Sequence, residues 1–222
     1  MCGRFAQAIP LGSLKKIDLF SRIEGFIPES YNVAPGEEPA IITNHEGYML
    51  QQSVWGFVNP LIKNNNKKQS FINARSETAA DKFYFRQAFK KGRCLIPVNG
   101  FYEWRKTGKE KIPFYISAGG EKSIEEDILF LAGIYSQAAG DTGRTTFAIL
   151  TRDALPPVSE IHDRMPVIIA TEGITTWLNE SSEADELMKI ITADYSNALK
   201  MHRVSPLVNS PRYKEKDAVT AI

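Results

Sequence analysis

The chain has 222 residues and a formal net charge of +1, with 43% hydrophobic and 24% charged residues. This composition excludes a disordered chain and provides enough apolar residues for a buried core, so we expect one domain over residues 1–222. No apolar run reaches membrane-spanning length and no export signal opens the chain, so we expect a cytoplasmic protein with no membrane partner.

In chain order, the pattern predicts a helix at 11–22 with Ser13 as its N-cap, strands at 40–43 and 48–54, and a helix at 78–91 ended by Gly92. Strands at 93–97, 101–104, 113–117, 129–135, 145–151 and 166–170 follow, and then helices at 171–180 and 182–191. Strands outnumber helices and are joined by short turns. We therefore expect an α+β fold, a compact domain around a mainly antiparallel, barrel-like sheet.

The near-neutral total charge hides a basic segment. Residues 63–111 contain thirteen Lys and Arg against four Asp and Glu, a net +9, so the rest of the chain carries −8. This segregation is typical of a protein that turns one face toward a polyanion, and also of a solvated helix face beside a basic loop. The charge pattern alone leaves both interpretations open.

The cysteines and histidines limit the available chemistry. Cys2 and Cys94 are too few for a disulfide framework, and the three histidines are not spaced as zinc ligands. We therefore predict no metal site and no cofactor. Cys94 lies in an apolar strand, where we expect it to be an inert core residue.

Cys2 is the most informative residue. Because Cys is small enough for the initiator Met to be removed ahead of it, we expect Cys2 to carry the free α-amine. An amine and a thiol on one residue react with an aldehyde: the amine forms a Schiff base and the thiolate closes a five-membered thiazolidine. An α-amine, with a pKa of about 7.7–8.0, is far less protonated at neutral pH than Lys. We expect Arg4 to favour the thiolate.

Three further polar clusters lie among apolar residues. Asn73 and Arg75 occupy alternate positions, which share one side of an extended segment, although a helix N-cap also explains that stretch. Glu103 stands among aromatic residues, which raise a carboxyl pKa, unless it lies on the solvent face of its strand. His162 is a natural acid or base near neutrality, although a loop histidine is often structural.

Together these segments resemble the SRAP (SOS response-associated peptidase) family. The resemblance rests on eight motifs in order, which are MCGRF at 1–5, YNVAP at 31–35, WGF at 55–57, NARSET at 73–78, RCLIP at 93–97, GFYEW at 100–104, HDRMP at 162–166 and VS at 204–205. It implies a sheet-rich α+β domain with a positively charged groove, consistent with the basic segment.

The resemblance also implies a sensor and shield for abasic sites in single-stranded DNA, whose ring-opened sugar is an aldehyde. Carried over by motif, Cys2 forms a thiazolidine DNA–protein cross-link, Asn73 orients the sugar or the amine, and Glu103 and His162 move protons. A Schiff base at the same amine permits weak lyase cleavage. The implied DNA contacts are Arg4, Arg75, Leu61, Ile62, Lys63 and Arg164.

One segment departs from the family pattern. After residues 55–57 the family commonly carries Pro and Trp residues that contact bases beside the lesion, whereas this chain has VNPLIK at 58–63. Leu61 and Ile62 stack less well than Trp, so we expect weaker binding of undamaged strands.

Two alternatives remain open. In the first, the protein is a peptidase or amidohydrolase in which Cys2 attacks an amide with its own amine as base. In the second, it is a non-covalent single-strand binding module in which Cys2 is incidental. In all three interpretations we expect a monomer, because the sequence has no heptad seam.

Overall fold

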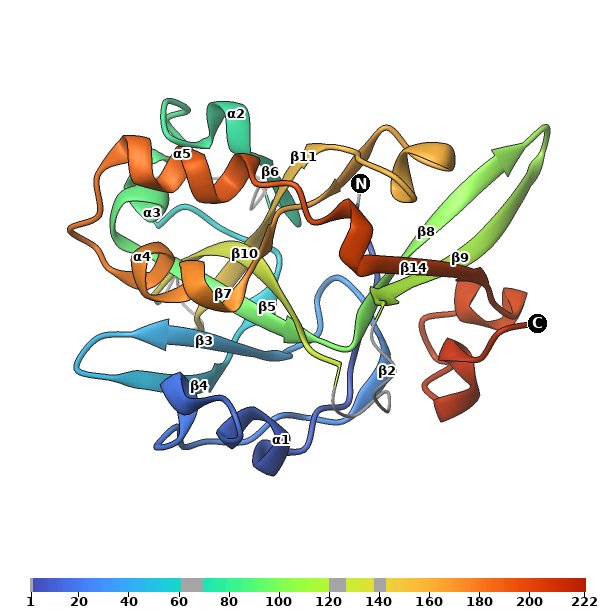
Figure 1. Cartoon of the computed structure of the whole chain (residues 1–222), viewed down its shortest axis with the longest axis horizontal. Helices are drawn as coiled ribbons and strands as arrows, with labels where there is room; N and C mark the ends of the chain where they lie inside the picture. Colours follow the sequence, from blue (N-terminus) through green and yellow to red (C-terminus); the bar gives the residue numbers. More distant parts are fainter. Residues whose placement is uncertain (1, 61–69, 120–126, 138–142) are drawn as a thin grey trace.

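The computed structural model describes residues 2–60, 70–119, 127–137 and 143–222. Two largely antiparallel sheets with short helices around them form an α+β fold, as predicted (Figure 1). Along the described strands both sheets are open, so they do not form the barrel-like closure that we expected. The single domain expected over residues 1–222 stays a prediction.

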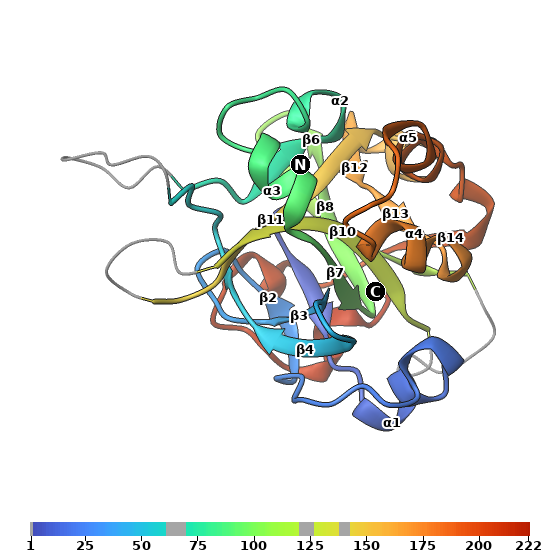
Figure 2. The same cartoon turned by 90° about the vertical axis from the view of Figure 1, so that its left-hand side faces the viewer.

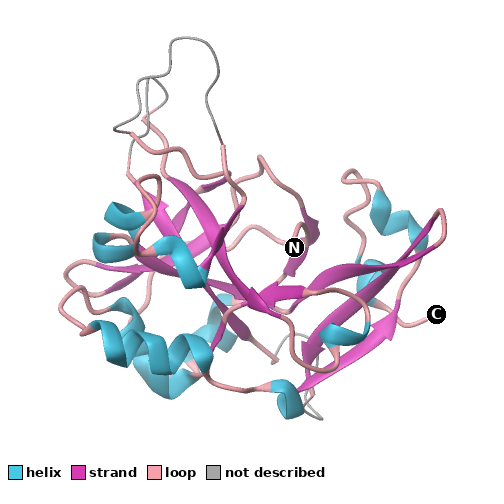
Figure 3. Ribbon diagram, turned by 90° about the horizontal axis from the view of Figure 1, so that it is seen from above, coloured by secondary structure: helices cyan, strands magenta, loops and turns pink. Residues whose placement is uncertain are grey.

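The first sheet has the order β14-β9-β8-β1-β2. Its strands are β1 (Phe5–Gln7), β2 (Ser30–Val33), β8 (Gly100–Thr107), β9 (Glu110–Ala118) and β14 (Leu199–Arg203). The β8–β9 hairpin turns at Gly108, whose φ of 60° lies in the left-handed region that glycine adopts without strain. The hairpin reaches out from the rest of the molecule on the side of the C-terminus (Figure 3).

The second sheet has the order β12-β11-β10-β7-β3-β4, with β13 paired to β10 and with β5 and β6 paired in parallel to β11. Its strands are β3 (Ala40–Asn44), β4 (Tyr48–Gln52), β5 (Val54–Trp55), β6 (Asn73–Arg75), β7 (Arg93–Val98), β10 (Leu129–Ser136), β11 (Thr146–Asp153), β12 (Arg164–Pro166) and β13 (Ile168–Ile169). β7 and β10 are buried along their whole length, which explains their continuous apolar runs.

The helices are shorter than the sequence pattern predicts. They are α1 (Leu11–Lys15), α2 (Ser76–Ala79), α3 (Arg86–Lys91), α4 (Ile174–Leu178) and α5 (Ala184–Thr192). Pro10, not Ser13, is the N-cap residue of α1. A capping box between Glu183 and Glu186 begins α5, two residues after the start that we predicted.

The helix predicted at 78–91 is wrong, because α2 and α3 are separated by a turn at residues 80–85. Residues 83 and 85 fall on nearly opposite faces of a helix, so one unbroken helix cannot bury both rings. The turn buries Phe85 against Phe57 and Phe71 and leaves Phe83 exposed.

The hydrophobic core lies directly beneath the first residues of the chain. Trp55 is fully buried, and its ring packs 4.9 Å from that of Phe5 and 6.3 Å from that of Phe147. Cys2 and Cys94 belong to the same buried cluster. Cys94 is therefore a core residue, as expected, and so is Trp55. The first residues of the chain pack on this core.

Candidate active site

Strand β1 fixes the position of the first residues, because it lies between β2 and β8 in the first sheet. Phe5 pairs with Phe101, and the backbone N–H of Tyr102 donates to the carbonyl of Arg4 at 2.9 Å. Arg4 therefore lies opposite Tyr102, and one residue further along each strand the same antiparallel register places Gly3 opposite Glu103. Two segments that lie a hundred residues apart in the sequence therefore meet at one edge of the sheet.

Strand β11 brings the other two clusters to the same place. It pairs with β6 along one edge, where Ile149 lies opposite Asn73, and with β12 along the other, where Asp153 lies opposite Arg164. Asn73 Nδ2 donates to the carbonyl oxygen of Cys2 at 2.8 Å, which joins the second sheet to the start of the chain. Within the described residues, Asn73 Oδ1 is buried and accepts no hydrogen bond.

The Cys2 side chain is 0% exposed, and its Sγ lies 3.8 Å from the carbonyl oxygen of Arg4. Burial raises the pKa of this thiol well above its usual range, and the nearby charge of Glu103 raises it further. Burial outweighs any effect of Arg4, so the thiol is neutral in this state, and a role of Arg4 in favouring the thiolate stays a prediction. The full chain carries Met1 on the Cys2 nitrogen, which becomes an amine only after Met1 is removed.

Glu103 is also buried, with 2% of its surface exposed, and Phe101 on the same side of β8 is fully buried. The solvent-facing alternative for Glu103 is therefore excluded. Burial raises the pKa of its carboxyl, while the positive charges of the amino terminus and of His162 oppose that shift. A carboxyl with a raised pKa keeps its proton to a higher pH than an ordinary carboxyl, which suits a proton donor.

His162 follows a turn of 3₁₀ helix at Val158–Glu160, and its backbone N–H donates to the carbonyl of Val158 at 3.0 Å. Its Nδ1 accepts from the backbone N–H of Arg164 at 2.9 Å. Nδ1 also lies 2.9 Å from Oδ1 of the exposed Asp163, a contact that becomes an ion pair only when the ring is protonated. In the neutral ring, acceptance at Nδ1 leaves the proton on Nε2, so the ring is a donor there.

Glu103 and His162 border a pocket of about 430 Å³, which begins next to Cys2 at Gly3. Its lining consists of Gly3, Arg4, Glu103, Trp104, Lys106, Lys111, His162 and Asn209. Lys106 and Lys111 are exposed and lie directly opposite each other across the β8–β9 hairpin. Like charges in that position destabilise a hairpin, so their placement beside the pocket favours a role in binding an anion. The sequence indicated a basic segment but not this pair, which depends on the hairpin register.

Asn32 is a residue that the sequence analysis quoted within a motif without assigning it a role. It is fully buried, and its Oδ1 accepts from Arg4 Nη1 at 2.8 Å. Its Nδ2 faces the carbonyl oxygens of Val208, Ser210 and Tyr213 at 3.2, 3.1 and 2.9 Å. Asn32 therefore joins Arg4 to the segment that follows β14, which starts with the 3₁₀ turn Pro206–Asn209.

That C-terminal segment forms one wall of the pocket. Trp104 Nε1 donates to Asn209 Oδ1 at 2.7 Å, and Arg4 Nη1 also donates to the carbonyl of Val208 at 2.9 Å. Lys214 Nζ donates to the backbone oxygen of Asn32 at 2.6 Å and so also joins this segment to β2. Trp104 is half-buried in the pocket wall.

The structure separates the predicted DNA contacts into three groups. Arg4 lines the pocket, and Arg75 is exposed at the end of β6. Arg164 is only 12% exposed, and its guanidinium binds Glu77 at 2.6 and 2.9 Å and Asp153 at 2.6 Å. A phosphate would have to displace these carboxylates from Arg164, whose role in DNA binding stays a prediction. The predicted contacts at Leu61, Ile62 and Lys63 lie outside the described residues.

Two further observations concern metal ions and membranes. Among the described residues, no three His, Cys, Asp or Glu side chains gather closely enough to hold a metal ion. In the described parts of the chain, no helix is both long and apolar enough to cross a membrane.

Comparison with known families gives the class of protein. The family model described as SOS response associated peptidase (SRAP) matches residues 1–211. The chain therefore belongs to the SRAP family, as the motifs predicted.

Several relatives of known name cover the whole chain. It is 33% identical over 99% of both chains to a Bacillus subtilis protein named abasic site processing protein YoqW. It is 29% identical over the full length of both chains to abasic site processing protein YedK of Escherichia coli. It is also 28% identical to abasic site processing protein HMCES of Gallus gallus, of which it covers 78%.

Solved structures support the fold. A protein from Bacteroides thetaiotaomicron has a TM-score of 0.81 over the full length of both chains at 24% identity. A phage-related protein from Bordetella bronchiseptica has a TM-score of 0.73 at 26% identity, over 91% of this chain and 94% of its own.

Proposed function

We propose that this protein processes abasic sites in single-stranded DNA by forming a covalent bond between Cys2 and the lesion. One observation carries the proposal: Asn73 holds the backbone of Cys2 where Glu103 and His162 border a cation-lined pocket. The names of the relatives support the same substrate class.

The proposed reaction is a condensation without redox change. After Met1 is removed, the Cys2 nitrogen attacks the aldehyde carbon C1′ of the ring-opened sugar, and a C–N bond forms. The carbonyl oxygen takes up two protons and leaves as water, which gives an iminium ion. Cys2 Sγ then adds to the same carbon, the thiol proton is released, and the thiazolidine ring is closed.

The neighbouring side chains fit these proton transfers. Because burial raises its pKa, Glu103 retains a proton to a higher pH than an ordinary carboxyl and can supply one to the departing oxygen. The resulting carboxylate can accept the proton of the Cys2 thiol. His162, with Nε2–H in its neutral form, is a second donor, and Asn73 Oδ1 can accept a hydrogen bond from the amine or from a sugar hydroxyl.

Cations near the pocket suit the phosphates on either side of the lesion. Arg4, Lys106 and Lys111 line the pocket, and Arg75 lies exposed at the end of the strand that carries Asn73. Charge-assisted hydrogen bonds from these groups would hold the strand while C1′ approaches Cys2. The preference for single strands, a weak lyase activity at the iminium stage and a monomeric state belong to the same proposal.

The test is a denaturing gel of purified protein mixed with a single-stranded oligonucleotide that bears one abasic site. An intact mass measurement first establishes that Met1 is absent. We expect a shifted band with the wild type and with Cys94→Ala, and no shifted band with Cys2→Ala or with an undamaged strand. If protein lacking Met1 gives no covalent species, the proposal is wrong, and amide hydrolysis by Cys2 becomes the next assay.

A further inference from the structure

Phe83 is an aromatic ring that the fold leaves outside the core. It lies in the turn between α2 and α3 and is 55% exposed, whereas Phe85 in the same turn is buried. The guanidinium carbon of Arg86 lies 5.4 Å from the centre of the Phe83 ring. Single exposed apolar side chains are common, so exposure alone carries no function. The surroundings of Phe83 are what distinguish it.

The backbone of this turn is fixed to the rest of the molecule. Asn59 is buried, and its Nδ2 lies 2.9 Å from the carbonyl oxygen of Tyr84 and 3.4 Å from that of Phe83. The Tyr84 ring packs 5.3 Å from Phe71, which is two residues before Asn73 in the chain. The backbone at Phe83 is therefore held in place by Asn59 and, through Tyr84, packs against the residues that lead into β6.

The charge around Phe83 is mixed, because Glu77, Asp81 and Glu180 line one pocket together with Arg86 and Lys90. Lys82, Arg86 and Lys90 are exposed on the turn and on α3, with Asp81 as the neighbouring acid. Arg75 is exposed at the start of α2, between this surface and Asn73. In two perpendicular views, α2 and the start of the chain lie on the same side of the molecule (Figures 1 and 2). Arg75, Lys82 and Arg86 are therefore exposed cations on the stretch of chain that leads from Asn73 to the exposed ring.

We propose that Phe83 is a stacking platform for a base of the single strand beside the abasic site, and that Arg86 binds the phosphate next to that base. The inference rests on the proposed function and extends it to the recognition of undamaged nucleotides. Every base presents a π face, so a ring with adjacent cations binds a strand without selecting its sequence. A ring held in place in advance loses little conformational freedom when a base stacks on it.

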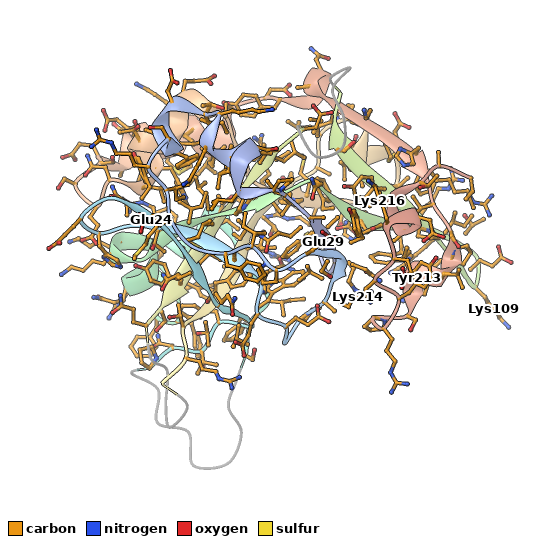
Figure 4. The ribbon with its side chains drawn as sticks, turned by 90° about the horizontal axis from the view of Figure 1, so that it is seen from below. Glu24, Glu29, Lys109, Tyr213, Lys214 and Lys216 are labelled. Carbon is orange, nitrogen blue, oxygen red and sulfur yellow. The ribbon has the colours of Figure 1, made fainter. Side chains whose placement is uncertain are left out.

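Phe26 provides a matched control on another side of the molecule. It is 65% exposed, so it resembles Phe83 in size and exposure. Its neighbours in the chain include the exposed acids Glu24 and Glu29, which are seen in the view from below (Figure 4). Carboxylates repel a phosphate backbone, so Phe26→Ala should leave DNA binding unchanged.

The experiment measures binding of a fluorescent oligo-dT by anisotropy in the Cys2→Ala background, where no covalent bond can form. We expect Phe83→Ala to weaken binding about 5- to 20-fold, and Phe83→Trp to retain binding and show quenched emission when oligo-dT is added. Arg86→Gln should lower the slope of log K against log[salt] by about 0.7, the value for one phosphate contact on a single strand. Equal affinities for Phe83→Ala and Phe26→Ala, or unquenched Phe83→Trp emission, would overturn the proposal.

A second measurement separates this inference from the proposed function. With Cys2 intact, Phe83→Ala should slow cross-linking at low concentrations of abasic DNA and leave the rate at saturating DNA unchanged. If cross-linking is normal and Phe83→Ala has no effect at any DNA concentration, only the stacking proposal fails. If the wild type forms no cross-link, the proposed function fails, and the oligo-dT titration still decides whether Phe83 stacks on bases.

Discussion

Asn32 provides the most direct test of how the pocket is built, and Asn32→Ala is the perturbation. The two hydrogens of Nδ2 are shared among three carbonyl oxygens, and Oδ1 accepts one hydrogen bond from Arg4. The change therefore removes the equivalent of three hydrogen bonds in a fully buried position. At about 1 kcal/mol each, the expected loss in free energy of unfolding is about 3 kcal/mol.

For a chain of this length, that loss corresponds to a decrease in Tm of about 6–12 °C. The effect should also be local, because the segment from Val208 to Tyr213 loses its buried anchor. We expect hydrogen exchange of the Val208 and Tyr213 amides to accelerate more than that of the buried strands β7 and β10. Thermal unfolding monitored by circular dichroism, together with hydrogen exchange, measures the two effects.

Asn99→Ala is the control for this prediction. Asn99 is also buried, and its Oδ1 accepts from the backbone N–H of Ala8 at 2.7 Å. It lines a pocket with Val219, Thr220 and Ala221 and not with residues 208–213. Its replacement should lower Tm without selectively releasing residues 208–213. If both variants change exchange in that segment equally, or if Asn32→Ala leaves Tm unaltered, the reasoning about Asn32 is refuted.

Two further predictions concern charge. Because burial raises the pKa of Glu103, the folded chain holds this proton more tightly than the unfolded chain, so its contribution to stability is lost as pH rises from about 4.3 through the raised value. Glu103→Gln should therefore have the same Tm as the wild type near pH 4 and a higher Tm at pH 8. It should also form the cross-link more slowly. A difference in Tm that does not depend on pH would contradict the prediction. Arg164→Ala should lower the free energy of unfolding by about 2 kcal/mol, measured in urea, because it removes the ion pairs with Glu77 and Asp153. Arg164→Lys should restore little of that loss, because an ammonium group cannot form the bidentate pair with Glu77. Full recovery with Lys would show that charge alone matters.

The sequence predicted the long strands and the candidate residues better than it predicted their environment. Strands such as β10 and β11 have apolar runs that identify them without further information. The three-residue β1 has no such signal, and yet its pairing with β8 is what sets Gly3 opposite Glu103. Burial of Glu103 likewise depends on the whole sheet, so the alternation within 101–104 left its two faces undecided.

Arg164 and Phe83 are two further residues whose environment the sequence did not predict. A cation in a motif suggested a DNA contact, but the carboxylates that surround Arg164 come from α2 and β11, which only the fold brings together. Phe83 lies near Phe85 and Phe89 in the sequence, and nothing in that stretch shows which of these rings is exposed. The turn that exposes it is held by Asn59, and no local pattern links that residue to Phe83.

The protonation of the site bears on the order of the proposed bond-forming steps. A thiolate would add to an aldehyde directly, whereas burial raises the pKa of Cys2 and keeps its sulfur protonated. The amine made by Met1 removal does not share that restriction, since an α-amine is partly unprotonated near neutral pH. Nitrogen therefore attacks first, and sulfur follows once Glu103 has given its proton to the departing oxygen and become a base. Under this order, borohydride should trap an amine-linked product with Cys2→Ser, whose hydroxyl closes the ring poorly. A thiol-first reaction would leave that variant with no trapped product.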